Sequence, residues 1–293
     1  MTLPTITIVT PTYNSERYLE ATIQSVLQQN YPALEYIIID GASSDGTGDI
    51  IRRYESHLSY WSSESDNGMY DALQKGFARS TGQIMAWLNS DDMYPSWTLR
   101  TVANIFADLP TVDWITSIRP LIWNSDGLAV DAMALQGYSK SGFLRGEHLP
   151  HHKGFILEVI QQESTFWRRS LWDSVGATLN TALRYAGDFE LWARFYQHSD
   201  LVGVRTPLGG FRQHGDQLSQ QAPDAYYQEA LTALQQHDGK HPSAWYHWKR
   251  HTLAPFFRQQ LRRLGTTLGI CYLTRIAVYN QDNHKWQIRV ISI

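Results

Sequence analysis

The chain has 293 residues, of which 43% are hydrophobic, and its formal net charge is −3. This length allows one large domain with an appendage or two small domains, and the hydrophobic content excludes a globally disordered chain. The single cysteine, Cys271, excludes an internal disulfide framework and favours a reducing compartment. Residues 1–4 carry no signal-peptide pattern, and no run of about 18 apolar residues occurs. We therefore expect a cytoplasmic protein that does not span a bilayer.

Two strand–loop–helix units open the chain. Residues 6–9 and 36–39 are short, largely β-branched runs, and each leads through a polar turn into apolar residues at helical spacing. Asn14 or Ser15 is the expected cap of the first helix. This order predicts βαβ units, and hence an α/β fold whose central sheet is mostly parallel and flanked by helices.

Two adjacent carboxylates, Asp91 and Asp92, end the apolar run of residues 84–88. Such a run is typical of a buried central strand, and ligands of parallel sheets bind just beyond the carboxyl ends of the strands. One alternative is that either aspartate caps the helix that begins near Pro95. Because a cap needs only one acceptor, we favour a site for a hard cation, Mg²⁺ or Mn²⁺, held against a diphosphate.

Asp40 stands at the tip of the second strand, followed by a loop rich in Gly and Ser. It either forms an Asx-turn in this loop or accepts hydrogen bonds from a nucleotide base or ribose. The chain has no G-x-G-x-x-G after its first strand and no G-x-x-x-x-G-K-[ST]. Both a dinucleotide oxidoreductase and a P-loop phosphotransferase are therefore disfavoured.

A third polar loop, residues 64–71, follows a short strand near Trp61. Asp66 and Gly68 lie in this loop, where a ligand can approach the backbone. Asp71, Lys75 and Arg79 are spaced four residues apart on one helix face, a pattern that an ordinary ladder of helix salt bridges also explains.

The second half of the chain gives weaker signals. Strands are expected at residues 113–118 and 201–204, and residues 137–154 are interpreted as a mobile loop with a solvated His151-His152 pair. Asp188 falls in the first turn of a predicted helix, where it either caps the helix or serves in catalysis. His214 ends a β-like segment and gains interest only if the fold returns it to Asp92.

Residues 239–293 carry nine Lys or Arg and one acid, together with many aromatic residues. Apolar residues between 257 and 268 recur at helical spacing beside arginines, which is typical of a helix that lies on an anionic membrane surface. The alternative is a helix packed on the rest of the protein. We predict a domain over residues 1–235, with halves at 1–100 and 101–235, and a helical basic extension over residues 236–293.

Four loops together resemble a known family. Thr10-Pro11-Thr12-Tyr13-Asn14, the loop from Asp40 to Thr47, the loop from Glu64 to Ala72 and Asn89-Ser90-Asp91-Asp92 are similar, in order, to the inverting family 2 glycosyltransferases of GT-A fold. The resemblance covers roughly residues 4–100, and the region from Gln162 to His214 resembles the acceptor half more loosely. Asn14 departs from the family pattern, because many members carry an acid there.

The resemblance implies a role for each matching position. Asp92 and His214 would hold the metal, Asp91 would touch the ribose or sugar, and Asp188 would be the catalytic base. Gln162, Trp167 and Glu190 are the candidate acceptor residues. The nucleotide-sugar would contact residues from the loops that follow the strands: Thr10, Pro11, Thr12, Asn14, Asp40, Asp66, Gly68, Asp71, Lys75, Asn89 and Asp91.

The sequence thus predicts an inverting, metal-dependent glycosyltransferase that takes a nucleotide-diphospho-sugar donor and a glycan or lipid-linked glycan acceptor. Surface-polysaccharide or lipid-linked oligosaccharide synthesis at the inner face of the plasma membrane is the expected setting. A nucleotidyltransferase and a sugar-nucleotide sensor without catalysis are the alternatives. Nucleic acid is not an expected partner, since no nucleic-acid-binding module matches.

Overall fold

The computed structural model describes residues 3–150, 159–215, 217, 221–240, 252 and 271–293. Its strands are β1 (Ile6–Thr12), β2 (Leu34–Asp40), β3 (Tyr60–Ser63), β4 (Ile84–Trp87), β5 (Trp114–Ser117), β6 (Leu121–Trp123), β7 (Ala129–Ala132), β8 (Thr165–Arg168), β9 (Val202–Val204), β10 (Gly210–Arg212), β11 (Leu273–Asn280) and β12 (Lys285–Ser292). Its α-helices are α1 (Leu19–Leu27), α2 (Thr47–Tyr54), α3 (Met69–Arg79), α4 (Thr98–Asp108), α5 (Lys140–Leu144), α6 (Arg169–Ser174), α7 (Gly187–His198) and α9 (Pro223–Gln236). Two 3₁₀ turns span Glu55–His57 and Gln162–Ser164.

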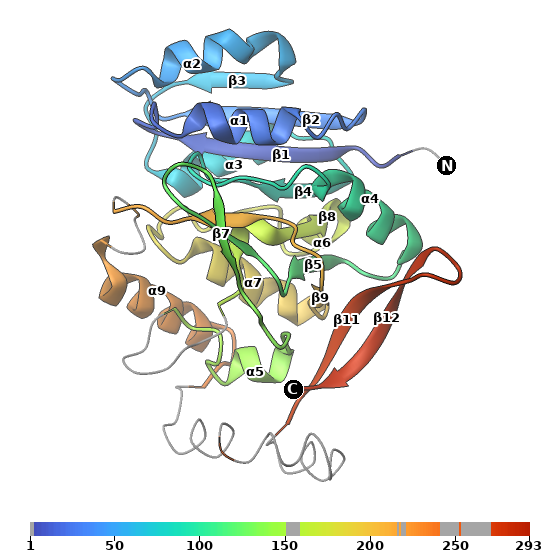
Figure 1. Ribbon diagram of the computed structural model, residues 1–293. Coiled ribbons are helices and arrows are strands. Elements are labelled where there is room, and N and C mark those ends of the chain that lie inside the picture. Colours follow the sequence, from blue (N-terminus) through green and yellow to red (C-terminus); the bar gives the residue numbers. More distant parts are fainter. Residues whose placement is uncertain (1–2, 151–158, 216, 218–220, 241–251, 253–270) are drawn as a thin grey trace.

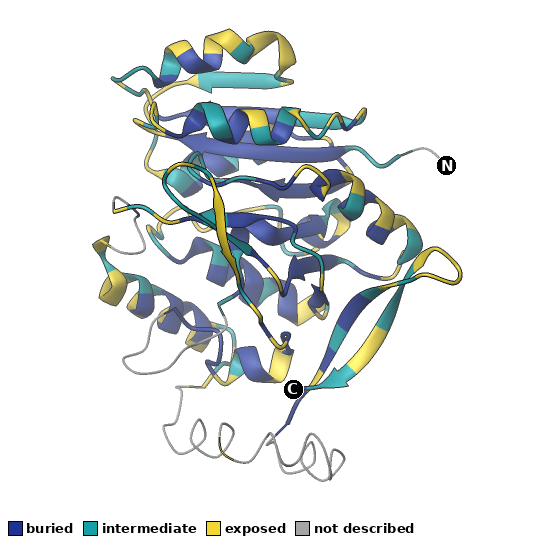
Figure 2. Ribbon diagram, in the orientation of Figure 1, coloured by how far each residue is buried: buried dark blue, intermediate teal, exposed yellow. Residues whose placement is uncertain are grey.

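A central sheet organises the described residues in the order β12-β11-β9-β5-β8-β4-β1-β2-β3 (Figure 1). All its neighbours run parallel except β8, which pairs antiparallel with both β4 and β5, and the β11–β12 hairpin. The predicted mostly parallel α/β sheet is therefore confirmed. A small second sheet, β10-β6-β7, lies beside it, and its strand β7 is exposed (Figure 2).

Buried β-branched residues explain the centre of the sheet. Every residue of β1 is buried, and both neighbouring strands run parallel to it. Between β4 and α7 the core is aromatic, with the Trp87 and Trp192 rings stacked at 5.8 Å and Trp167 packed edge-on against both. This core joins β4 to α7 and so fixes the distance between the two ends of the site described below.

Two local expectations differ from the structure, and a third is not tested by it. Helix α1 begins after Tyr18 and has no side-chain cap, because the Ser15 carbonyl accepts from the Leu19 N–H instead. The described part of the supposed mobile loop, residues 137–150, includes α5 and buries Tyr138 and Phe143 completely. The predicted His151-His152 pair lies outside the described residues.

The carboxyl-terminal extension contributes two strands that the sequence reading did not include. Strand β11 pairs in parallel with β9, and β12 pairs with β11 in a hairpin at the end of the sheet opposite β3 (Figure 1). The residues of β12 alternate between polar and apolar types from Lys285 to Val290, as in a sheet with one face covered. The helix predicted around residues 257–268 lies outside the described residues.

Candidate functional site

Three strand ends meet at one edge of the sheet. Thr12, at the end of β1, is the register partner of Asp40, at the end of β2, and Asp40 is the partner of Ser63 in β3. Asp40 is buried, and its carboxylate accepts hydrogen bonds from the Ser63 hydroxyl at 2.6 Å and from the Ser43 N–H at 3.1 Å. The Asx-type turn is therefore present. Thr12 Oγ1 is buried beside it without a partner among the described residues.

The loops beyond these strands are tied to one another. Asn14 adopts a positive φ of 47°, donates its N–H to the Ser43 hydroxyl at 2.8 Å and accepts from the Ser44 N–H at 2.9 Å. The Asp66 carboxylate lies against Gly41, where a Cβ would stand 2.8 Å from Oδ2. Asp66 also accepts from the N–H of Gly68, whose φ is +113°. These contacts shape a polar edge in which Asn14 and Asp66 face the loops next to Asp40.

Asp71 and Lys75 hold the start of α3. The Asp71 carboxylate accepts from the Asn67 N–H at 3.0 Å, and this bond, with the Lys75 ammonium at 3.3 Å, lowers the pKa of Asp71. Lys75 Nζ also donates to the Ser65 carbonyl at 3.4 Å. The helix salt bridge is therefore formed, and both side chains support the loop that carries Gly68.

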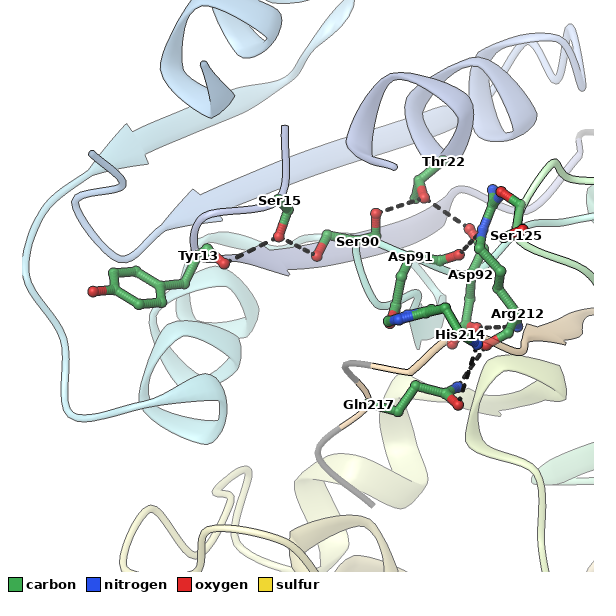
Figure 3. Close-up of polar contacts among 10 residues, drawn as sticks. All are labelled: Tyr13, Ser15, Thr22, Ser90, Asp91, Asp92, Ser125, Arg212, His214 and Gln217. Atoms are coloured by element: carbon green, nitrogen blue, oxygen red, sulfur yellow. Dashed lines mark hydrogen bonds and ion pairs between the residues drawn. The ribbon is translucent and has the colours of Figure 1, made fainter. Parts of the chain in front are cut away.

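The loop after β4 separates its two aspartates. Asp92 is 1% exposed, and its Oδ1 accepts from the backbone N–H of Arg212 at 2.9 Å. The Asp91 side chain is 30% exposed, and its Oδ2 lies 2.9 Å from His214 Nε2 (Figure 3). Helix α4 begins at Thr98 without a side-chain cap, so neither aspartate caps it. The fold therefore does return His214 to this loop, and it brings His214 to Asp91.

Burial distinguishes Asp92 from Asp91. It raises the pKa of Asp92 well above its usual range, and the charges of Asp91 and Glu163 add to that effect. The Asp92 carboxyl holds the loop in place through its hydrogen bond with the Arg212 N–H. Asp91 is the carboxylate that faces outward, beside His214, whereas the sequence reading assigned the metal to Asp92 and the ribose or sugar to Asp91.

Arg212, in β10, is a site residue that the sequence reading missed. Its Nε donates to the Asp91 carbonyl at 2.6 Å and its Nη1 to the Ser125 carbonyl at 3.1 Å (Figure 3). Its guanidinium lies 4.8 Å from the Tyr18 ring centroid, and that ring lies 4.7 Å from the His214 ring. Arg212 thus joins β10 to the Asp91 loop. A basic residue two positions before His214 was the available signal.

The residues present fit a divalent cation only as part of its shell. No group of three or more His, Cys, Asp or Glu side chains that could hold a metal occurs in the described part of the chain. Asp91 and His214 supply two donors at one point, and Asn89 Oδ1 is buried nearby in the same loop without a described partner. Mg²⁺ and Mn²⁺ commonly take few protein ligands and complete their shell with substrate phosphates and water.

Asp188 lies in the first turn of α7, as predicted. Burial raises the pKa of its carboxyl to about 6, against the opposing effect of hydrogen bonds from backbone N–H groups and from the Tyr226 and Tyr70 hydroxyls. Its Oδ2 lies 3.5 Å from the Tyr226 hydroxyl, and its Oδ1 is buried without a partner among the described residues. A carboxylate with a pKa near neutrality and one unoccupied oxygen is suited to general-base chemistry.

Glu163 connects the two ends of the site and was also missed from sequence. It is 3% exposed, and burial, with the charges of Asp188 and Asp91, raises its pKa to about 8. Its Oε1 has no partner among the described residues. Its neighbour Gln162 donates to the Trp87 carbonyl at 2.6 Å and so anchors this turn to the end of β4.

Four predicted contact residues lie in the core instead. Thr10 is buried, and its hydroxyl bonds the Tyr36 hydroxyl at 3.1 Å; Pro11 is buried within β1. Trp167 is fully buried in the aromatic core, and Glu190 forms an ion pair with Arg194 at 2.8 Å. Sequence position alone does not show which side of a strand or helix faces the site, and a contact between these side chains and the substrate stays a prediction.

Comparisons with known proteins agree with this geometry. The sequence model described as Glycosyl transferase family 2 matches residues 7–146. TuaG of Bacillus subtilis, named for teichuronic acid biosynthesis, is 40% identical over 96 residues, which are 31% of this chain and 37% of TuaG. A glycosyltransferase of Rickettsia typhi, RT0329, is 26% identical over 220 residues, which are 75% of this chain and 67% of that protein. The chain thus spans little more than a third of TuaG.

Solved structures share the fold. S. aureus TarS 1-349 in complex with UDP-GlcNAc superposes with a TM-score of 0.60 at 18% identity, over 90% of this chain and 75% of that one. The mannosyltransferase PcManGT from Pyrobaculum calidifontis, in complex with GDP-Man and Mn²⁺, gives 0.56 at 20% identity, over 83% of this chain and 67% of that one. Residues 7–146, which include the strand-end loops, are thus similar to glycosyl transferase family 2, and the chain shares the fold of these solved structures.

Proposed function

We propose that the protein is an inverting glycosyltransferase that moves a sugar from a nucleotide-diphospho-sugar to a hydroxyl acceptor with the help of a divalent cation. The observation that carries this proposal is the arrangement of the Asp91–His214 pair and Asp188 on either side of the buried Glu163 carboxyl. At one end Asp91 and His214 converge at 2.9 Å, and at the other Asp188 presents an unpartnered carboxyl oxygen. The match of residues 7–146 to the family model and the sugar-nucleotide complexes of the structural neighbours support it.

The nucleoside end of the donor is assigned to the edge formed by β1, β2 and β3. Asp40 and Thr12 lie there side by side, and Thr12 has a buried hydroxyl oxygen without a described partner. Asn14 and Asp66 border the same edge. Polar groups at the carboxyl ends of parallel strands are the usual ligands of nucleotides in α/β folds.

The diphosphate is assigned to the loop after β4. Asp91 and His214 would hold a Mg²⁺ or Mn²⁺ ion, and the ion, when bound, would neutralise charge on the departing diphosphate. Asp92 is proposed as a support, because it is buried and fixes the loop to Arg212. This assignment exchanges the roles first expected for the two aspartates.

Asp188 is the proposed general base. It takes the proton from the acceptor hydroxyl as that oxygen forms a bond to the anomeric carbon, while the bond from this carbon to the diphosphate oxygen breaks. Attack from the face opposite the leaving group inverts the anomeric centre and needs no covalent enzyme intermediate. The buried Oδ1 of Asp188 is the atom that would receive the proton.

A glycan or lipid-linked glycan acceptor in surface-polysaccharide synthesis is proposed from TuaG, the relative named for teichuronic acid biosynthesis. The described residues contain no helix that is long and apolar enough to cross a membrane. We propose cytoplasmic placement with the basic residues 239–293 at the inner face of the plasma membrane. Those residues carry nine Lys or Arg and a single acid, so they would be attracted to anionic lipid.

The test uses UDP-, GDP-, dTDP- and CMP-sugars, each with and without Mn²⁺, in a thermal-shift assay. The true donor raises Tm in a concentration-dependent manner, and Mn²⁺ increases the shift. Transfer to candidate acceptors follows, with the anomeric configuration of the product read by NMR. A retained configuration excludes the inverting mechanism. A donor that binds but is never transferred or hydrolysed favours the sensor. Formation of a nucleoside triphosphate and a sugar phosphate from the donor and added pyrophosphate favours the nucleotidyltransferase.

A further inference from the structure

Helix α9 is hydrogen-bonded to the loop that leads into α7. The Glu229 carboxylate accepts hydrogen bonds from three consecutive backbone N–H groups, those of Arg184 at 3.2 Å, Tyr185 at 2.8 Å and Ala186 at 3.0 Å. The last of these residues immediately precedes α7. Hydrogen bonds to a charged acceptor are among the stronger ones in proteins, and three on one carboxylate fix the loop backbone. Asp188 lies two residues after Ala186, the last of these three donors.

Tyr70 of α3 holds the same loop from the other side. Its hydroxyl donates to the Tyr185 carbonyl at 3.0 Å and accepts from the Asp188 N–H at 3.4 Å. A Cβ on Gly187 would lie 2.7 Å from the Tyr70 ring, so the bare backbone packs directly against that ring. The backbone around Asp188 is therefore held between α3 and α9.

Tyr226 adds a contact to the Asp188 side chain itself. It lies three residues before Glu229 on α9, a spacing that puts both side chains on one face of the helix. Its hydroxyl lies 3.5 Å from Asp188 Oδ2, whereas Oδ1 is buried without a partner among the described residues. One oxygen of the carboxyl is thus held by α9, and the other is left for a substrate.

We propose that Glu229 and Tyr226 are positioning residues for the base: Glu229 fixes the backbone of the loop, and Tyr226 orients the Asp188 carboxyl so that Oδ1 meets the acceptor hydroxyl. This inference rests on the proposed role of Asp188. Helix α9 lies outside residues 7–146, which the family model matches, so nothing in that match assigns it a task. The Tyr226 hydroxyl also lowers the pKa of Asp188, opposing the effect of burial.

A merely structural α9 would stabilise the fold without acting on the base, and the variants are chosen to separate the two roles. Glu229→Ala removes all three acceptor contacts and should lower kcat about 100-fold, as expected for a misplaced catalytic group, with the donor KM unchanged. Glu229→Gln keeps one oxygen acceptor and should recover part of this loss. Gln228→Ala, at an exposed neighbouring position of α9, is the matched control and should keep wild-type kcat.

The second measurement does not need transferase activity. In protein labelled with ¹³C at the Asp carboxyl carbons, Asp188 should titrate at higher pH in Tyr226→Phe than in wild type, because the anion loses a hydrogen-bond donor. Hydrogen exchange over residues 184–188 should be faster in Glu229→Ala. An unaltered Asp188 titration in Tyr226→Phe, or wild-type kcat in Glu229→Ala, overturns the proposal.

These readouts also separate the inference from the proposed function. A protein that transfers no sugar from any donor, yet shows the shifted titration and the faster exchange, refutes the proposed function and leaves the positioning of Asp188 by α9 intact. A protein that transfers sugar with wild-type kcat after Glu229→Ala supports the function and refutes the positioning role.

Discussion

The pKa of Asp188 gives a quantitative prediction for the pH dependence of transfer. Burial raises it from an ordinary value of 3.8 to about 6, and a general base acts only in its ionised form. The rate should therefore fall as pH decreases through about 6. At pH 5 about one tenth of the base would remain ionised, whereas an aspartate of ordinary pKa would remain more than about nine tenths ionised.

The assay is kcat/KM for the acceptor between pH 4.5 and 8 at saturating donor. Protonation of the metal ligands produces a similar acidic limb, because protons and metal compete for the same donor atoms. Measurements at two Mn²⁺ concentrations that differ tenfold separate the causes, since only a limb due to metal ligands moves. Asp188→Asn should abolish transfer and keep the thermal shift with the donor. A limb near pH 4, or one that moves with Mn²⁺, refutes the assignment.

Three further predictions follow from the site and the extension. Asp91→Asn and His214→Ala should each lower turnover at least about 100-fold and reduce the effect of Mn²⁺ on donor binding, and full activity in excess EDTA would contradict this. Glu163→Gln should raise Tm more at pH 8 than at pH 5. The folded state keeps a proton on Glu163 up to about pH 8, whereas the unfolded chain loses it near pH 4.5, so the wild type loses stability between these pH values and the variant does not. Equal Tm shifts at both pH values would contradict the raised pKa of Glu163. Replacing Arg258, Arg262 and Arg263 by Gln should weaken co-sedimentation with anionic vesicles, since each basic residue near such a surface contributes about 1 kcal/mol; unchanged pelleting would exclude the membrane role.

The last of these variants keeps β11 and β12 in the chain. A truncation near Gly239 would also remove β11 and β12, and β11 pairs directly with β9 in the central sheet. Loss of binding in the truncated chain would then report unfolding as much as the loss of charge. Substitution of the arginines keeps the full chain and removes three positive charges, and neutral vesicles serve as the control for both proteins.

Local patterns in the sequence determined the strand ends and their chemistry. The β-branched runs of β1 and β2 and the apolar run before Asn89 are long enough to fix strands, and the parallel arrangement then places Thr12, Asp40 and Asp91 at one edge. Asp188 was placed in the first turn of α7 because helical periodicity and its preceding Gly187 are local signals. Such features depend on residues close in sequence, so they can be predicted without the fold.

Tertiary structure alone decided which side chains at that edge are buried and which partners they meet. Asp92 is buried because the N–H of Arg212, 120 residues later, closes on its carboxylate, and Asp91 meets His214 for the same reason. Strand β8 enters antiparallel between β4 and β5, which buries Trp167 and turns Glu163 toward the site. Helix α9 brings Glu229 to the loop before Asp188. These outcomes depend on contacts between segments that are distant in sequence. Neither the hydrophobic periodicity nor the composition of the sequence determines how such segments align with one another.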